Sequence, residues 1–263
     1  MEYERHRWSK MPHTYKYPRP SLTVDCVVFG IDPTDEHPLK VLLIKRGLEA
    51  KNGDPAERAF IGSWALPGGY VKVADEGGQG EGLEEAARRE LFEEAGIKVD
   101  YLEQLYTFGE PGRDPRGRVV SVAYYALVSS GDHEAKAGSD AVGAYWFSIH
   151  GVQKGLCLGL VFDHLKILET ALSRLQVKVR YAPVGFNLLP PKFTIPQLQR
   201  VYEAILMRKL EKRNFRKRIL KMEVLVARGM ESGSGRTGPK AALYSFDKRA
   251  YDKAVRDGFN FEI

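Results

Sequence analysis

The residues most suited to chemistry lie in the stretch from Leu83 to Ile97, LEEAARRELFEEAGI. Glu90, Glu93 and Glu94 stand at positions i, i+3 and i+4, so a helix brings their carboxylates onto neighbouring faces. Carboxylates placed so closely repel one another at neutral pH. A hard divalent cation prefers oxygen ligands and would offset this repulsion, so the stretch predicts a magnesium site, with manganese as an alternative metal.

A solvated acidic helix face is the plainer interpretation of such a stretch, and we adopt it for Glu84 and Glu85. The three later glutamates follow an apolar strand, Trp64 to Leu66, that leads into the double glycine Gly68-Gly69. Glycine lets backbone carbonyls approach a metal or a phosphate closely, and Gly96 provides a left-handed helix cap. The apolar stripe expected to hold this helix in place comprises Leu83, Ala87, Leu91 and Ala95.

This combination of strand, double glycine and acidic helix resembles the Nudix hydrolase family. The family motif is G-x5-E-x7-R-E-U-x-E-E-x-G-U, where U is a bulky aliphatic residue, and the segment from Glu81 to Ile97 matches it. The first glycine of the motif is replaced by Asp75, and the nearest candidate, Gly69, has eleven intervening residues before Glu81 instead of five. We interpret residues 74–80 as containing a six-residue insertion that leaves the acidic helix intact.

The resemblance implies hydrolysis of a nucleoside diphosphate linked to another group, most simply ADP-ribose to AMP and ribose 5-phosphate. It implies that Glu90 and Glu94 bind the metal, with Gly69 beside them. Glu93 is a third ligand or the base that activates water, and Arg89 orients the glutamates by bidentate pairing. Four further arginines could clamp phosphate or ribose, although each could equally be a surface residue: Arg46, Arg113, Arg116 and Arg118.

The remaining patterns predict an α/β fold. Mixed strands with two long helices are typical of a three-layer sandwich around a mixed sheet, as in the Nudix fold. We expect an N-terminal arm at residues 1–20, the Nudix domain at 21–180, a proline-rich linker at 181–192 and a second domain at 193–263. The expected strands are Ser21–Phe29, Lys40–Lys45, Trp64–Leu66, Val99–Phe108, Arg118–Val128 and Gly143–Ser148, and a further helix is expected at Leu160–Leu175.

The charge of the chain is divided unevenly. The formal net charge is +6, but the part from Pro190 to Ile263 has 17 basic and 8 acidic residues, whereas the rest has 23 and 26. The acidic part contains the metal helix, and the basic part is expected to have an anionic partner.

The basic part has the pattern of a winged helix-turn-helix. Thr194 can cap a first helix, Lys212–Met222 is expected to be the recognition helix, and strands at Glu223–Val226 and Ala242–Phe246 would form the wing, before a final helix at Lys248–Val255. A solvated basic domain used only for dimer contacts is the alternative. The residues expected to contact double-stranded DNA are Lys212, Arg213, Arg216, Lys217, Arg236 and Lys240.

The basic part also resembles the winged-helix domain of the Nudix-related transcriptional regulators of NAD metabolism. As a family, these regulators sense ADP-ribose and bind palindromic operators as homodimers. The segment around QLYTFGEPGRDPRG is similar to ADP-ribose pyrophosphatases. Because the metal motif is kept, our main prediction is an active, magnesium-dependent hydrolase with a DNA-binding domain. The alternative is a regulator whose Nudix domain only senses ADP-ribose, or a sugar.

Other features indicate a cytoplasmic protein. The first residues have no apolar secretory segment, and no run is long enough to span a bilayer. Cys26 and Cys157 are far apart, and Cys26 lies in an apolar strand as expected for core packing. The six histidines lack metal-ligand spacing, so we interpret them, His164 included, as structural.

Overall fold

The computed structural model describes residues 16–33, 35–47, 60–73, 80–129, 141–155, 159–230 and 241–263. Within these ranges, the larger part of the molecule contains a seven-stranded mixed sheet with the central order β3-β2-β1-β6-β5. Strands β1 and β6 run parallel, and the other pairings are antiparallel. The strands are β1 (Ser21–Ile31), β2 (Leu39–Arg46), β3 (Trp64–Ala65), β4 (Gly68–Tyr70), β5 (Tyr101–Phe108), β6 (Val119–Ser129) and β7 (Ala141–Ser148).

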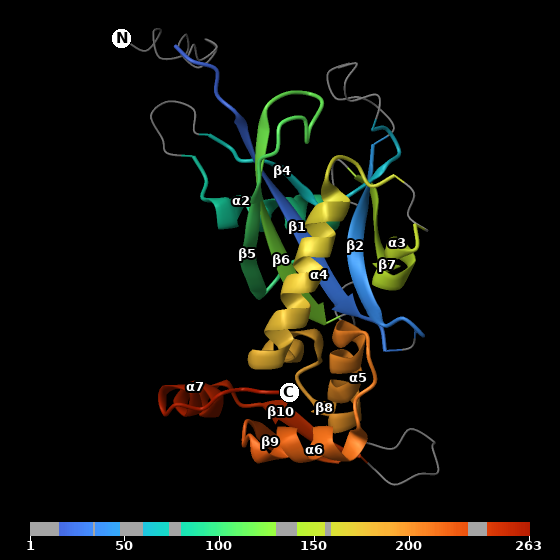
Figure 1. Cartoon of the computed structure of the whole chain (residues 1–263), viewed down its shortest axis with the longest axis vertical. Helices are drawn as coiled ribbons and strands as arrows, with labels where there is room; N and C mark the ends of the chain where they lie inside the picture. The colour runs from blue at the N-terminus through green and yellow to red at the C-terminus, as the bar shows by residue number, and fades with distance from the viewer. Residues whose placement is uncertain are drawn as a thin grey trace.

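Strand β1 is buried on both faces of this sheet. Successive side chains of a strand point to opposite faces, so Cys26 and Val28 enter one apolar cluster while Val27 and Phe29 enter another. Helix α2 (Leu83–Ala95) covers the first face and helix α4 (His164–Tyr181) covers the second (Figure 1). The short helix α3 (Ile149–Gln153) follows β7. The predicted three-layer sandwich with a mixed sheet is confirmed.

Helix α2 forms as its sequence predicts. Its apolar stripe is buried against the sheet, and Gly96 ends it with φ of 67°, the left-handed cap that glycine adopts without strain. The prediction for α4 was wrong at both ends. Phe162 has φ of 55°, which keeps residues before His164 out of the helix, and the apolar stripe continues past Leu175 to Val179.

The C-terminal part is a winged helix-turn-helix. Helix α5 (Ile195–Leu206) begins at a capping box in which the Thr194 hydroxyl accepts from the backbone N–H of Gln197. Helices α6 (Lys212–Lys221) and α7 (Lys248–Arg256) follow, separated by strands β9 (Leu225–Met230) and β10 (Ala242–Phe246). A short strand that sequence reasoning missed, β8 (Phe193–Thr194), pairs with β10 and completes a three-stranded sheet.

The segment expected to be a loose linker packs into the core instead. Residues 183–188 form the 3-10 helix η4 (Pro183–Leu188), and Val184, Phe186 and Leu188 are buried in it. Phe186 stacks on Phe246 of β10, with ring centroids 4.4 Å apart. One apolar cluster therefore runs from β1 through α4 and η4 into α5 and α6. The two parts follow each other along the long axis of the molecule (Figure 1), and this core joins them.

No helix in the described ranges is both long enough and apolar enough to cross a lipid bilayer.

The shared core predicts that the two parts unfold together. Truncating the buried Phe186 to alanine should lower the free energy of unfolding by about 3–5 kcal/mol, the usual loss for a buried aromatic ring. Urea denaturation followed by circular dichroism measures this change and should show one transition for the wild type. Phe92→Ala is the control, because this ring is 54% exposed and its loss should cost less than about 1 kcal/mol. Separate transitions for the two parts would contradict the shared core.

Candidate functional site

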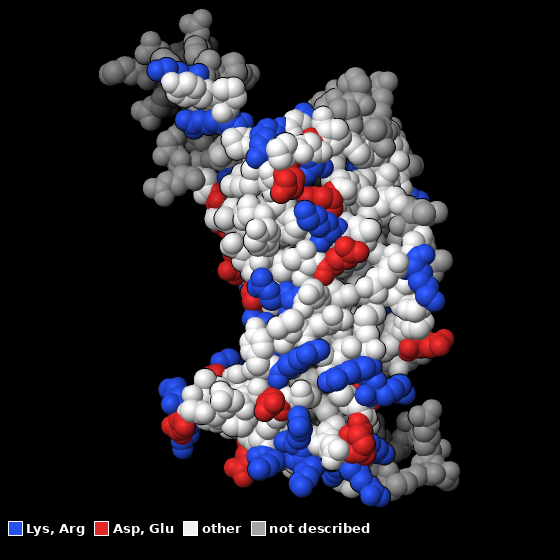
Figure 2. All heavy atoms as spheres, viewed as in Figure 1, with Lys and Arg blue, Asp and Glu red and all other residues white. Residues whose placement is uncertain are grey.

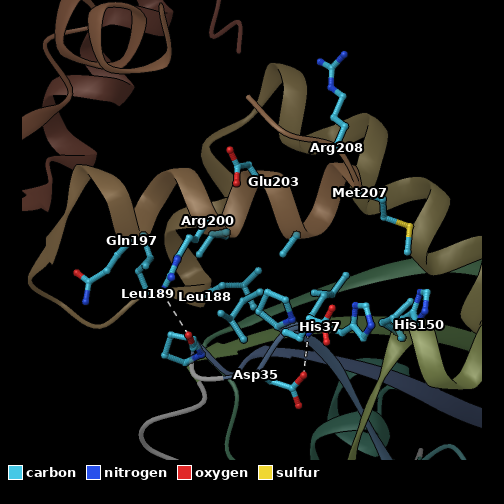
Figure 3. Close-up of a pocket in the computed structure, with 18 of the residues that line it drawn as sticks. Asp35, His37, His150, Leu188, Leu189, Gln197, Arg200, Glu203, Met207 and Arg208 are labelled. Atoms are coloured by element: carbon cyan, nitrogen blue, oxygen red, sulfur yellow. Dashed lines mark hydrogen bonds between the residues drawn. The ribbon is translucent and has the colours of Figure 1, made fainter. Parts of the chain in front are cut away.

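The acidic helix faces a pocket of about 490 Å³. One side of the pocket is formed by the carboxylates of α2 and the double glycine of β4, and the other by the loop at residues 113–116 and by Phe162 before α4. A larger cavity, of about 950 Å³, lies between α5 and the turn after β1, where Arg200 donates to the Pro33 carbonyl (Figure 3). That cavity contains no residue of the acidic motif, so the smaller pocket is the candidate site.

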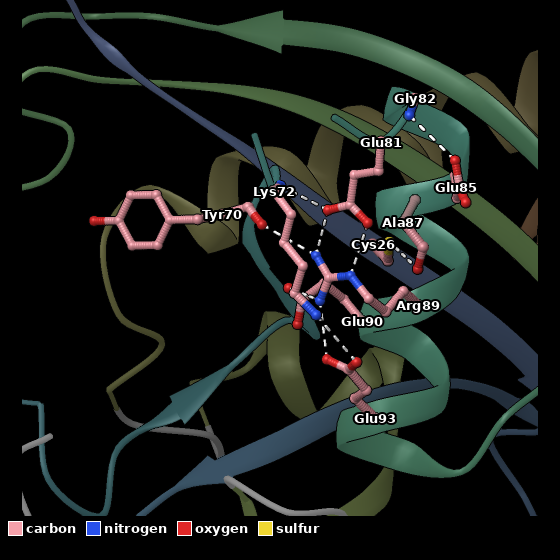
Figure 4. A network of polar contacts seen from close by, with 10 residues as sticks. All are labelled: Cys26, Tyr70, Lys72, Glu81, Gly82, Glu85, Ala87, Arg89, Glu90 and Glu93. Atoms are coloured by element: carbon pink, nitrogen blue, oxygen red, sulfur yellow. Dashed lines mark hydrogen bonds and ion pairs between the residues drawn. The ribbon is translucent and has the colours of Figure 1, made fainter. Parts of the chain in front are cut away.

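Arg89 is the centre of the polar network on α2 (Figure 4). Its guanidinium binds Glu81 in a bidentate pair, with Nε–Oε2 of 2.8 Å and Nη2–Oε1 of 2.6 Å. Its Nη1 donates to Glu90 at 2.6 Å and to Glu93 at 2.9 Å, and its Nη2 donates to the Tyr70 carbonyl at 3.1 Å. Arg89 thus offsets the repulsion among the carboxylates from which the metal site was predicted. Its expected pairing with glutamates is present in the structure.

The same network explains the protonation behaviour of the motif. Hydrogen bonds from Arg89 lower the pKa of Glu81 to about 2, and the backbone N–H of Lys72 adds a 2.7 Å hydrogen bond to this carboxylate. Burial raises the pKa of Glu90, while its hydrogen bond with Arg89 acts in the opposite direction. The Lys72 ammonium lies 3.4 Å from Glu93. Glu81, which lies beside the loop insertion, therefore belongs fully to the network.

The double glycine is required by close contacts. A side chain at Gly69 would place its Cβ 2.4 Å from the Glu90 carboxylate, and one at Gly68 would meet the Val24 carbonyl at 2.2 Å. The Gly68 N–H donates to Glu94 at 2.8 Å. At Gly68 the backbone contact excludes any side chain, whereas a side chain at Gly69 would displace the Glu90 carboxylate from its place in the network.

The donor set suits a hard divalent cation in its chemistry. Glu90, Glu93, Glu94 and the Gly69 backbone supply oxygen atoms around one pocket. With Glu81 they bring four carboxylates against the charges of Arg89 and Lys72, which leaves negative charge in excess. In the described parts of the chain, however, no three His, Cys, Asp or Glu side chains already surround a common point as metal ligands. A bound cation would share Glu90 and Glu93 with Arg89.

An aromatic and cationic wall faces the carboxylates. The guanidinium of Arg116 lies 5.0 Å from the ring centre of Phe162, and that of Arg46 lies 5.9 Å from it. Phe60 packs against the same ring with centroids 4.7 Å apart. Arg116 also forms a bidentate pair with the buried Asp114. This wall offers a flat apolar surface with positive charge beside it. The positive φ of Phe162 costs about 1–3 kcal/mol, and such strain is concentrated at functional sites.

Arg113 is held differently from the two arginines of the wall. Its side chain is 4% exposed and forms a bidentate pair with Asp163 and a 3.2 Å hydrogen bond with Asp25. Asp25 also accepts a 2.5 Å hydrogen bond from Ser121, and its second oxygen lies 3.3 Å from Nε2 of His164. Although burial raises the pKa of Asp25, these partners lower it below its ordinary value.

The tautomer of His164 follows from its partners. Nδ1 accepts the backbone N–H of Leu66 at 2.9 Å, so the ring proton resides on Nε2 and faces Asp25. Sequence reasoning missed Asp25, Asp163 and Ser121. Asp25 had a usable signal, because a lone carboxylate in a doubly buried strand must have a partner.

Arg118 is not brought to this pocket. Its Nη1 donates to the carbonyl of Gly109, in the loop after β5, and the residue is not part of the pocket lining. The described geometry gives it a role in fixing that loop. Arg46, Arg113 and Arg116 do line the pocket, and their contact with a ligand stays a prediction.

Helix α6 presents a basic face to solvent. Phe215 and Ile219 are buried, whereas the predicted DNA-contacting residues of the helix are exposed: Lys212, Arg213, Arg216 and Lys217. Lys221, also predicted on the basic side of this helix, is exposed, and so is Arg218, which the prediction did not include. Lys and Arg side chains gather over this end of the molecule (Figure 2). The predicted wing residues Arg236 and Lys240 lie outside the described ranges.

The turn before α6 is fixed by two glutamates. Glu203 of α5 accepts from the Leu210 N–H at 3.0 Å and from Gln199, and Glu211 caps α6 by accepting from Arg213 and Asn214. These hydrogen bonds fix the turn between α5 and α6, from which the basic face of α6 extends.

Comparison with protein families matches two parts of the chain. The NUDIX domain matches residues 20–170, and the NrtR DNA-binding winged helix domain matches residues 185–246. The first match spans more than half of the chain and includes the pocket. The second includes η4 from Gly185 on, both helices of the helix-turn-helix and the β9–β10 hairpin.

Individual relatives match either nearly the whole chain or little more than half of it. The chain is 35% identical to the ADPR responsive transcriptional repressor NtrR of Acinetobacter baylyi, over 93% of this chain and 87% of that protein. It is 37% identical to the ADP-ribose pyrophosphatase of Methanocaldococcus jannaschii, over 58% of this chain and 73% of that enzyme. Among solved structures, Shewanella oneidensis NrtR complexed with a 27mer DNA matches with a TM-score of 0.68 and 32% identity, covering 91% of this chain and 97% of that chain.

The Arg89 network predicts a stability change that depends on pH. The folded-state pKa of Glu81 is about 2 against an ordinary 4.5, so its contribution is present above pH 4.5 and is lost as pH falls toward 2. Arg89→Met should lower the free energy of unfolding by roughly 3 kcal/mol at pH 7 and by much less at pH 3. Urea denaturation at both values measures this difference.

The control for this experiment is Arg88→Met. Arg88 pairs with Glu84 on a more exposed side of the same helix and donates to the Val99 carbonyl, so its loss should cost about 1 kcal/mol. A loss for Arg89→Met that is equal at pH 7 and pH 3 would contradict an electrostatic role.

Proposed function

The chain belongs to the Nudix family and, within it, to the branch of the NrtR regulators, and from this membership we propose that it is a transcriptional regulator that responds to ADP-ribose. The observation that carries the proposal is the exposed basic face of α6. The buried side of this helix packs into the same apolar core as the sheet that forms the Nudix pocket. In our proposal, residues 21–180 bind the nucleotide and residues 193–263 bind double-stranded DNA. The regulator acts in the cytoplasm as a homodimer on a palindromic operator.

The chemistry of the pocket supports a ligand of the ADP-ribose type. The guanidinium groups of Arg46 and Arg116 lie over the Phe162 ring, where they offer a flat cationic surface for a base and positive charge for a pyrophosphate. Two relatives of this chain carry ADP-ribose in their names, one as a regulator and one as an enzyme. We therefore favour ADP-ribose over a sugar effector.

A second function, hydrolysis of ADP-ribose to AMP and ribose 5-phosphate, is supported by the three motif glutamates that line the pocket, Glu90, Glu93 and Glu94. Glu90 and Glu94, with the Gly69 backbone, would hold magnesium or manganese. When bound, such a cation neutralises the charge of the pyrophosphate and activates water for attack at phosphorus. Glu93 would accept the proton of that water or complete the ligand set, and Arg89 would keep the glutamates in place.

The regulatory proposal is tested by DNA binding. The probe is a duplex selected from a random-sequence pool by the wild-type protein. Its affinity should change roughly tenfold or more when ADP-ribose is added without metal, in the usual range of allosteric coupling. Arg216→Ala should weaken binding about 5- to 100-fold and reduce the salt slope by about one, since one phosphate contact is lost.

Arg88→Ala on α2 is the matched control for this test, since it removes an exposed arginine far from α6 in the sequence. It should leave both DNA affinity and salt slope unchanged. An ADP-ribose titration without effect on wild-type affinity would overturn the regulatory proposal.

The enzymatic proposal is tested by release of AMP. Wild-type protein with magnesium and ADP-ribose should release AMP, and Glu94→Gln should reduce the rate by at least about 100-fold, because a neutral amide is a poor ligand for a hard cation. Glu169→Gln, an exposed residue of α4, is the charge-matched control and should retain full activity. Absence of AMP release from the wild type would leave ligand sensing as the sole role of the pocket.

A further inference from the structure

Asp163 occupies the N-cap position of α4 without capping it. An aspartate at this position normally accepts a hydrogen bond from a backbone N–H of the first turn. Here the Asp163 side chain makes no capping bond. Both of its oxygens bind Arg113 instead, with Nε–Oδ2 of 3.0 Å and Nη2–Oδ1 of 2.6 Å. The backbone N–H groups in the first turn of α4 are therefore alternative partners that this carboxylate does not use.

Of the two carboxylates on Arg113, Asp163 is the one able to move. Asp25 is fixed by Ser121 and His164 and is 9% exposed, whereas the Asp163 side chain is 17% exposed. The two carboxylates, of Asp25 and Asp163, surround the single guanidinium of Arg113. An anionic ligand group approaching Arg113 is repelled until one carboxylate leaves, and Arg113 lines the ligand pocket whereas Asp163 does not.

Helix α4 connects this position to the DNA-binding part. Its buried residues Leu168, Leu172 and Leu175 belong to the same apolar cluster as Phe186 of η4 and Val201 of α5. At its last turn, the Arg180 carbonyl accepts the N–H of Ile263, the last residue of the chain. Close-packed interiors shift between discrete arrangements instead of deforming smoothly, so a change at the start of α4 moves the helices that pack on it.

We propose that Asp163 is the element that relays ligand binding to DNA binding. When an anionic group of the nucleotide pairs with Arg113, Asp163 leaves the guanidinium and caps α4, and the resettled helix shifts α5 and α6. Without the ligand, Asp163 stays on Arg113 and α4 stays uncapped. This inference rests on the proposed regulatory function and names the residues that produce its coupling.

The test is Asp163→Asn in the full-length chain. Asparagine caps helices as well as aspartate does, but it has no charge with which to hold Arg113. The variant should therefore adopt the ligand-bound arrangement without ligand. Its affinity for the selected duplex should equal that of the ADP-ribose-bound wild type, and added ADP-ribose should change it by less than about twofold.

The affinity for ADP-ribose gives a second readout. ADP-ribose no longer has to displace a carboxylate, so isothermal titration calorimetry should show it binding more tightly to Asp163→Asn than to the wild type. Hydrogen exchange of the Leu165 and Lys166 amides should slow when ADP-ribose is added to the wild type and should already be slow in the variant. A merely structural defect would weaken ADP-ribose binding instead.

Two further variants complete the experiment. Glu169→Gln removes an equal charge from the exposed face of α4 and should keep wild-type coupling. Asp163→Ser, a second capping residue without charge, should reproduce the asparagine result with a melting temperature close to that of the wild type. Wild-type coupling in both Asp163 variants would overturn the inference while leaving the regulatory function intact. Absence of coupling in the wild type and in Glu169→Gln would overturn the regulatory function itself.

Discussion

Taking a carboxylate out of water costs several kcal/mol unless a cation and hydrogen bonds replace the lost hydration. Around the pocket, two arginines provide these cations and hydrogen bonds. Arg89 gathers Glu81, Glu90 and Glu93 on the acidic helix, and Arg113 joins Asp25 to Asp163 across the opposite wall. Each guanidinium binds elements that are distant in sequence, so the two arginines determine where the loop at residue 81, the loop at residue 113 and the start of α4 lie. The shape of the pocket follows from where these charges are paired.

This arrangement changes how the acidic motif is understood. The repulsion among its glutamates gave the initial reason to expect a metal, yet Arg89 already offsets most of it. The acidic helix can therefore keep its place without a cation, while its four carboxylates, set against Arg89 and Lys72, leave negative charge on this side of the pocket that would attract one. Under the proposed function, sensing would depend on the wall formed by Arg46, Arg116 and Phe162, whereas hydrolysis would also require Glu90 and Glu93 to be freed from Arg89.

Local patterns in the sequence predicted most elements, the acidic helix among them, because hydrophobic periods and caps act over a few residues. The capping box at Thr194 and the left-handed Gly96 are examples. The errors arise where distant contacts decide. Helix α4 begins late because Phe162 is held in a strained conformation, and the expected linker is buried because Phe186 finds Phe246 far along the chain. Arg113 was predicted to meet a ligand, but its partner Asp163, fifty residues away, was not visible from spacing.

A regulator whose pocket also destroys its effector has to satisfy a kinetic condition. The fraction of protein carrying ADP-ribose follows its dissociation constant only while hydrolysis is slow compared with dissociation; otherwise the Michaelis constant determines occupancy. Slow turnover therefore favours sensing. In this pocket Arg89 shares its guanidinium with Glu90 and Glu93, so these two residues would hold a cation less tightly than free carboxylates would. Under the proposed function, the pairing that stabilises the acidic helix would thereby lengthen the life of a bound effector. The same ion pairs would incline the pocket toward signalling, and any hydrolysis that remained would limit how long the signal lasts.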